Sequence, residues 1–270
     1  MMMIMIVMVK MNPSKKDSAK VKRYEIEYNR WLKKVIKTFG KVTREAAINL
    51  LYSEQELSED LVKVFMDKLN LDKVNFTFDG VLKENLKFIE RQSTKEVKKR
   101  LKGKKKVSEL EKIINEILPQ KIASSAITTN ETIVDKKNFF ELQKDIIESQ
   151  LEIIYEKRKN QLDVFRSSFL LDTQDKKELF NRKYKEPKYK FTDTVSRTQV
   201  NNLNRDLAAS MATNVGANKG EWVTSNDERV RESHRKLNGE VFYYNKLPSE
   251  YNDENCRCSL LPIFDFLNDL

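Results

Sequence analysis

The sequence predicts an α+β protein with a predominantly helical N-terminal region, followed by long helices packed with a small C-terminal antiparallel sheet. Apolar residues recur at three- and four-residue spacing over most of the chain, which is typical of amphipathic helices. Only 6 of the 270 residues are glycine and 5 are proline, which disfavours a β-sandwich or a barrel. Past residue 216 the pattern changes to short runs typical of strands, separated by turn signals.

The first part of the chain is expected to form several helices. Apolar side chains over residues 24–39 mark the first helix, and Gly40 is expected to end it. The apolar set over residues 57–69 predicts a second helix with Ser58 as its N-cap. Residues 76–80 indicate a turn before the next helical segment.

Two further helical segments, at residues 82–89 and 110–117, complete this region, and Pro119 is expected to close it. The polar, Ser/Thr-rich stretch that follows predicts a linker. The expected parts are an N-terminal extension (residues 1–15), a helical region with a basic cluster (16–118), the linker (119–134) and a C-terminal domain (135–270).

The C-terminal domain is expected to begin with a long helix over residues 135–171. Pro187 prevents a continuous helix through the basic segment that follows. Another helix is expected over residues 194–211. The apolar stripe of this second helix consists of Val200, Leu203, Leu207 and Met211. The core-facing residues expected on the first are Phe139, Phe140, Leu142, Ile146, Ile147, Leu151, Ile154, Leu162 and Phe165.

Short elements are expected after this helix. Residues 221–224 predict a strand, and Ser225 with Glu228 forms a capping box that would open a helix ending at Lys236.

An Asn238-Gly239 turn leads into a second strand over residues 240–244, and residues 258–264 predict a third. We expect the second strand to pair with residues 256–263.

The N-terminal run over residues 1–9 is apolar but shorter than the ~20 residues that cross a bilayer. No basic region precedes it and no small-residue cleavage site follows, so we expect a loose or buried extension and no membrane contact. The chain has 2 cysteines, which excludes a disulfide-framed fold and suits a reducing cytoplasm.

The net charge of +10 is concentrated in two segments. Residues 91–106 hold nine basic residues and one acid, and residues 176–190 hold seven basic residues and two acids. These segments carry +8 and +5, so the rest of the chain carries −3. Such a distribution is typical of a surface that contacts a polyanion, and the alternative is a solvated helix face. The candidate nucleic-acid-binding residues are Lys98, Lys99, Arg100, Lys102, Lys104, Lys105 and Lys106.

The only histidine in the sequence, His234, excludes mechanisms and metal centres that need a histidine pair. With Cys256 and Cys258 it can supply three of the four ligands of a structural zinc ion, leaving Asp227, Asp253 or Glu254 as the fourth. Alternatively, the cysteines are small buried apolar groups and His234 bonds a backbone carbonyl or a carboxylate.

A catalytic role for these residues is not expected. Asp227 and His234 would lie about 10 Å apart along a helix that rises 1.5 Å per residue, too far to bond. Asp227 and Arg231, four residues apart, can pair on that helix. Trp222 is expected to anchor the core. No nucleophile, phosphate-binding glycine loop or acidic metal cluster stands near these residues, so no catalytic residues and no enzyme are predicted.

An ordered set of residues over 135–264 resembles the phage Mu F-like head-morphogenesis family, the minor head or minor capsid proteins of tailed bacteriophages. Other members often carry an additional Cys or His pair where this chain has Arg231, Ser233 and residues 253–255, and this departure favours the packing interpretation. The residues that carry the resemblance are Arg197, Thr198, Trp222, Asp227, Arg231, His234, Gly239, Pro248, Cys256, Arg257 and Cys258.

The resemblance implies a structural virion protein that lies inside the head near the portal and acts in head morphogenesis, DNA packaging and ejection. The implied partners are the portal protein, a major capsid or scaffolding protein and double-stranded DNA, with no small-molecule substrate. The host cytoplasm is implied as its location during assembly.

Two other classes remain open from the sequence. Some Mu F-like domains are fused to toxin-like enzymes, but residues 1–130 show none of the motifs of ADP-ribosyltransferases or nucleases. A nucleic-acid-binding protein without a virion role is supported only by the basic segments.

Overall fold

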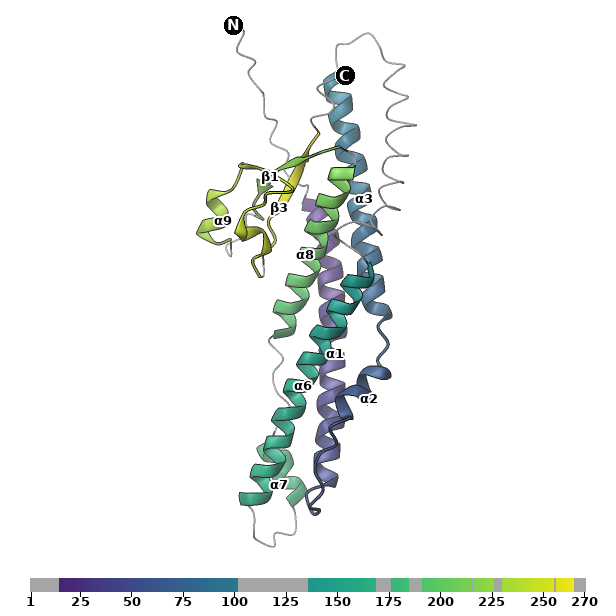
Figure 1. Ribbon diagram of the computed structural model, residues 1–270, viewed down its shortest axis with the longest axis vertical. Coiled ribbons are helices and arrows are strands. Elements are labelled where there is room, and N and C mark those ends of the chain that lie inside the picture. Colours follow the sequence, from purple (N-terminus) through teal and green to yellow (C-terminus); the bar gives the residue numbers. More distant parts are fainter. Residues whose placement is uncertain are drawn as a thin grey trace. The chain divides into compact units, whose positions relative to one another are not determined.

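The computed structural model describes residues 15–101, 136–168, 176–184, 191–214, 216–225, 230–254 and 256–264 (Figure 1). It is mostly helical, with a small antiparallel sheet formed by residues near the C-terminus, so the predicted α+β class is confirmed. Residues 1–14 of the expected N-terminal extension, the linker and the helix over 110–117 lie outside the described residues, and Lys15 already belongs to a helix.

The helices are α1 (Lys15–Asn49), α2 (Leu61–Asp67), α3 (Asp72–Leu101), α6 (Lys136–Ser168), α7 (Lys176–Lys183), α8 (Phe191–Asn214) and α9 (Glu232–Lys236). The strands are β1 (Lys219–Val223), β2 (Val241–Tyr243) and β3 (Ser259–Ile263), and a 3₁₀ turn, η2, covers Ser249–Asn252. Within the described part of the chain, no helix has an apolar stretch long enough to cross a membrane.

The chain divides into two compact units, each built from several segments. The sheet unit consists of Met1–Ile26, Thr77–Lys136 and Arg197–Leu270, and the helical unit of Glu27–Phe76 and Lys137–Ser196. Segments from before and after the predicted linker therefore contribute to each unit.

The helical unit is held by two apolar clusters. The larger consists of Leu32, Val35, Ile36, Phe39, Leu57, Val62, Met66, Ile147, Leu151, Ile154 and Tyr155. The smaller consists of Ala47, Leu51, Leu162, Phe165 and Phe180. Two buried tyrosine hydroxyls of this unit are paired: Tyr28 donates to Gln143 at 2.6 Å, and Tyr155 donates to the Leu57 carbonyl at 2.9 Å. Pairing these buried groups avoids the desolvation penalty of an unmade hydrogen bond.

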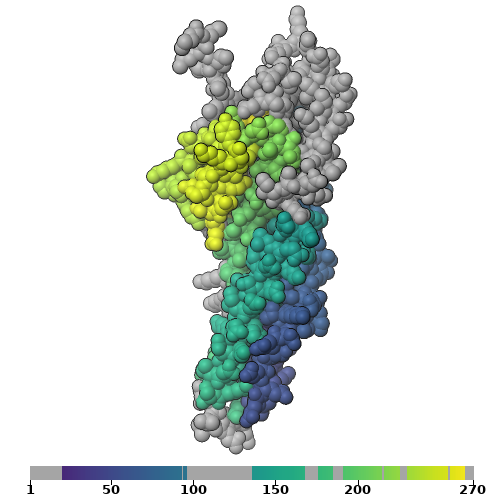
Figure 2. Space-filling model, viewed as in Figure 1, coloured from purple at the N-terminus to yellow at the C-terminus, as the bar shows by residue number. Residues whose placement is uncertain are grey.

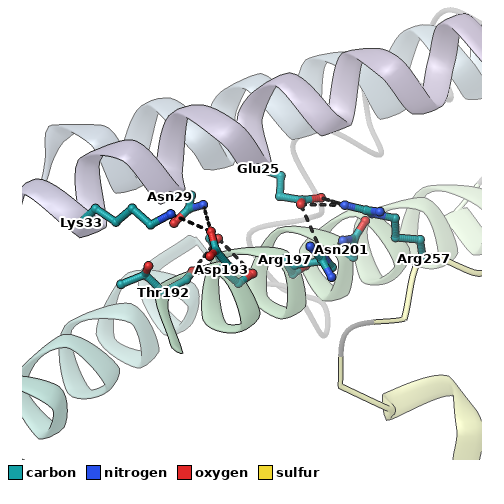
Figure 3. A network of polar contacts seen from close by, with 9 residues as sticks. Glu25, Asn29, Lys33, Thr192, Asp193, Arg197, Asn201 and Arg257 are labelled. Atoms are coloured by element: carbon teal, nitrogen blue, oxygen red, sulfur yellow. Dashed lines mark hydrogen bonds and ion pairs between the residues drawn. The ribbon is translucent and has the colours of Figure 1, made fainter. Parts of the chain in front are cut away.

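An exposed contact also joins α1 and α8 inside the helical unit. The Asp193 carboxylate accepts hydrogen bonds from Asn29 and from Lys33 at 2.5 and 2.8 Å (Figure 3).

The expectation that Gly40 ends the first helix is wrong, because α1 continues to Asn49. The buried face continues past Gly40 through Thr43 and Ala47, and Ala47 packs in the smaller cluster. Tertiary packing thus outweighs the roughly 1 kcal/mol that a glycine costs inside a helix.

Two local predictions near α2 and α3 are also wrong. Helix α2 has Asp60 at its N-cap position, and Ser58 contributes only its backbone carbonyl, to the Leu61 amide at 3.3 Å. Residues 76–80 do not form a turn, since α3 runs through them. Position 80 requires a residue without a side chain, because a Cβ there would lie 2.1 Å from the Tyr24 ring.

We expect Gly80→Ala to destabilise the protein, because overpacking costs about 1–3 kcal/mol while the gain in helix propensity is about 1 kcal/mol. In a Tyr24→Ala background the ring is gone, and the same substitution should stabilise. The measurement is the free energy of unfolding in urea for all four proteins. A stabilising Gly80→Ala in both backgrounds would contradict this account of the contact.

The expected long helices after the linker are confirmed as α6 and α8. Val200, Leu203, Leu207 and Met211 are all buried, as the stripe on α8 predicts. On α6 one expected core residue is wrong: Leu142 is 49% exposed, and the polar Gln143 beside it is buried in its place because it accepts from Tyr28.

The three strands form one antiparallel sheet of order β2-β1-β3. Strand β1 pairs with β2 (Gly220 opposite Phe242) and with β3 (Trp222 opposite Leu260). The strands themselves are confirmed, but the expected pairing of residues 240–244 with 256–263 is wrong because β1 lies between them. The short strand β2 occupies an edge, where Tyr243 is 57% exposed.

The predicted capping box does not open the last helix. Helix α9 begins at Glu232, and Arg231 before it is extended, with ψ 151° and no side-chain cap. Ser225 is not helical and Glu228 lies outside the described residues.

Candidate functional site

The sheet unit contains a small apolar core centred on Trp222 of β1. This side chain is 1% exposed, which confirms the prediction that it anchors the core. Its ring meets the imidazole of His234 and the ring of Phe242 edge-on, at centroid distances of 5.6 and 6.2 Å. The surface of the C-terminal segment around this core is yellow in Figure 2. The buried residues of the core are Trp222, Tyr251, Cys256, Cys258 and Leu260.

The turn after α9 fixes this helix against β1. The Asn238 side-chain oxygen accepts from the Thr224 backbone amide at 3.0 Å, and the Gly239 amide donates to the Trp222 carbonyl at 2.8 Å. Gly239 has φ +89°, a left-handed conformation that favours glycine, so the predicted Asn-Gly turn is confirmed.

His234 lies at the centre of a chain of polar contacts. Its Nδ1 atom is 3.3 Å from Cys256 Sγ, and its Nε2 atom is 2.8 Å from Asp253 Oδ2. The donor atoms of His234, Cys256 and Cys258 all lie within 4.8 Å of one another, and all three residues are buried. The structure therefore brings together the three residues that the sequence singles out as candidate ligands.

Asp253 supports His234 from outside this cluster. Its Oδ2 atom also accepts from Arg231 Nη1 at 2.8 Å, and Arg231 Nη2 donates to the Glu254 carbonyl at 2.9 Å. The hydrogen bond from His234 and the charge of Arg231 hold the pKa of the Asp253 carboxyl below its usual value. Arg231 thus pairs with Asp253. The expected pair with Asp227 is not tested, because Asp227 lies outside the described residues.

The two thiols differ in their acidity because they bond to each other. The Cys256 sulfur accepts the Cys258 thiol and the Cys258 amide, the latter at 3.2 Å, and these bonds lower the pKa of Cys256 to about 6. The same thiol bond raises the pKa of Cys258. The guanidinium of Arg205, only 3% exposed, favours the thiolate at both positions.

Arg205 also connects α8 to the turn η2. Its guanidinium lies over the Tyr251 ring at 4.8 Å and donates to Asn202. Next to it, burial raises the pKa of Asp206, whose carboxylate bonds to Tyr251.

A second polar cluster, the Glu25 clasp, ties α1 to α8 and to the segment before β3. It consists of Glu25, Arg197 and Arg257 (Figure 3). Arg257 Nη2 donates to both Glu25 carboxylate oxygens at 2.8 and 3.1 Å, and Arg197 Nε lies 3.4 Å from Oε1. The Glu25 side chain is 10% exposed, so both guanidinium groups converge on one nearly buried carboxylate.

Most residues of the sequence signature therefore support the fold. Thr198 is buried on α8, Pro248 is the residue before η2, and Arg257 points to the Glu25 clasp while Cys256 and Cys258 point to His234. The sulfurs of Cys256 and Cys258 lie on the same side of the chain, as expected, although both cysteines precede strand β3.

The candidate nucleic-acid-binding residues are not tested by the structure. Lys98, Lys99 and Arg100 lie on the backbone of α3 without described side chains, and Lys102, Lys104, Lys105 and Lys106 lie outside the described residues.

Sequence reasoning missed Glu25 and Arg205. Glu25 occupies the apolar stripe of α1 between Val21 and Tyr28, and a charge on such a stripe is the signal that a buried partner is required. Arg205 is likewise a buried charged residue, and it lies beside the apolar stripe of α8.

Comparison with known proteins finds a family match over part of the chain. The family model described as Phage Mu protein F like protein matches residues 174–261. Residues 174–261 are similar to the Mu F-like family. The match confirms the resemblance and includes every signature residue from Arg197 to Cys258, whereas Glu25 lies outside it.

One relative is an uncharacterized protein of Haemophilus influenzae, 39% identical over 75 residues. The matched part covers 26% of this chain and 17% of the length of that protein. No solved structure matches the chain. The match relates residues 174–261 to a family of phage proteins.

Proposed function

We propose that the chain is a structural minor head protein that lies inside the phage head near the portal. In this role it binds the portal protein and DNA during head assembly, packaging and ejection, and it does not catalyse a reaction. Contacts to a major capsid or scaffolding protein, and residence in the host cytoplasm during assembly, belong to the same proposal.

The observation that carries the proposal is the Mu F-like domain at residues 174–261. Its signature residues are used inside the domain: Trp222 fills the core, and Arg197 and Arg257 hold Glu25. Such use suits a module that presents a stable surface to a partner, since no member of the Glu25 clasp remains for substrate chemistry.

The test is co-expression of the full chain with the portal protein of the same phage. We expect the chain to co-purify with the portal oligomer and to show no turnover of nucleotides, esters or nucleic acid. Nuclease or NAD-consuming activity that is reproducible and is lost in His234→Ala would overturn the structural role. Failure to co-purify would remove the portal as the partner.

The basic segment 91–106 is proposed to bind DNA without sequence preference. Its charge is dense and it contains no aromatic residue on which a base can stack. Counterion release predicts that log affinity falls with log salt at a slope of about −0.9 per phosphate neutralised. Reversing Lys98, Lys99, Arg100, Lys104, Lys105 and Lys106 to Glu should abolish binding at low salt.

A matched control reverses six exposed lysines elsewhere, so that the change in net charge is the same. Suitable positions are Lys34, Lys37, Lys41, Lys63, Lys144 and Lys157, all on the surface of the helical unit. Equal loss of affinity in both variants would show that only net charge matters and would contradict a localised DNA site.

A further inference from the structure

We propose that the Mu F-like domain of this chain binds one zinc ion through His234 Nδ1, Cys256 Sγ and Cys258 Sγ. This inference concerns the internal structure of the domain and goes beyond its position in the virion, so its failure would leave the proposed function standing.

The first support is the geometry of the donor atoms. All three lie within 4.8 Å of one another, with Cys256 Sγ 3.3 Å from His234 Nδ1. A tetrahedral zinc ion with Zn–S of about 2.3 Å and Zn–N of about 2.05 Å places sulfur and nitrogen ligands about 3.5 Å apart. The observed separation needs an adjustment of only a few tenths of an ångström.

The second support is the contact on the far side of the imidazole. A carboxylate only accepts hydrogen bonds, so Nε2 of a neutral His234 donates its proton to Asp253 and Nδ1 keeps its lone pair toward the cysteines. Histidine ligands of zinc usually donate their other ring N–H to a carboxylate in this way, which fixes the tautomer and the ring orientation. Asp253 Oδ2 bonds to both His234 and Arg231. Asp253 therefore orients the His234 imidazole and is not itself one of the three proposed zinc ligands.

The third support is the charge around the thiols. Thiolates are the form of cysteine that binds metal. The Cys258 amide donates to Cys256 Sγ at 3.2 Å and stabilises the same form. Two thiolates and Zn²⁺ together are neutral, so the ion removes the cost of burying negative charge at both positions.

A zinc ion would also supply stability where the apolar core is small. The core around Trp222 has only five buried members among the described residues, two of them the cysteines. Small modules of this kind commonly depend on a structural metal. Here the ion would join α9, which carries His234, to the segment that leads into β3.

The test uses the full chain, purified without a histidine tag and without chelator. We expect elemental analysis to find about one zinc per chain. Cobalt-substituted protein should show the visible absorption of tetrahedral Co²⁺ with thiolate ligands, and X-ray absorption at the zinc edge should show two sulfur neighbours. Cys256→Ser, Cys258→Ser and His234→Ala should each lose the bound zinc.

Because removing a ligand can unfold the domain, Asp253→Asn provides a second test that keeps all three donor atoms. It should weaken zinc affinity by about 10–100-fold, measured by competition with a chromophoric chelator. The matched control is Glu232→Gln, an exposed carboxylate on α9, the helix that carries His234, and it should leave affinity unchanged. Protein without stoichiometric zinc, whose cysteines are alkylated at the same rate with and without added zinc, would overturn the proposal.

Discussion

Glu25→Gln is expected to lower the free energy of unfolding of the sheet unit by about 2–3 kcal/mol. The substitution keeps the shape of the side chain but removes the charge that Arg197 and Arg257 share. Breaking a fully buried pair costs about 3–5 kcal/mol, and the arginine side chains here are 21% and 25% exposed, which reduces the penalty. Urea unfolding followed by circular dichroism measures the effect.

The control for this prediction is Glu45→Gln, an exposed carboxylate on the same helix, which should change stability by less than about 0.5 kcal/mol. Combining Glu25→Gln with Arg257→Met should cost less than the sum of the two single changes, because both remove one interaction. Additive losses, or a stable Glu25→Gln protein, would contradict the importance of the Glu25 clasp.

Trp222→Ala is expected to cost about 3–5 kcal/mol, the range for removing a large aromatic side chain from a packed core. Trp222 is 1% exposed and its ring contacts both His234 and Phe242, so the cavity would open onto α9 and β2 together. Hydrogen exchange of the backbone amides of β1 and α9 should show faster opening of both elements.

Tyr243→Ala on the adjacent strand serves as the control, because that side chain is 57% exposed and should contribute less than about 1 kcal/mol. Similar losses in the two variants would show that the sheet has no localised core at Trp222.

The sequence predicted those parts of the fold in which local pattern and tertiary packing agree. The apolar stripe on α8, the strand at Trp222 and the turn at Gly239 all have local signals that the structure retains. At Gly40 and Gly80 local propensity suggested an interruption, but distant side chains decide the outcome. Position 80 is glycine inside a helix because the Tyr24 ring occupies the space of a Cβ, and the sequence alone does not reveal that contact.

The candidate site was predicted in part for the same reason. Cys256, Cys258 and His234 carry their chemistry in their residue types, so composition and spacing single them out. Glu25 is an ordinary residue type more than 170 positions from its first partner, Arg197. The role of Asp253 as the carboxylate on His234 depends on the start of α9 at Glu232, which the capping-box pattern placed too early.

The most direct test of the proposed role is the protein content of purified, DNA-filled phage heads. Quantitative mass spectrometry of intact particles should find this chain in a few copies per head, together with the portal protein. It should resist external protease until the heads are opened, because it lies inside them. Absence of the chain from filled heads, or complete digestion on intact particles, would contradict a minor head protein in the head interior.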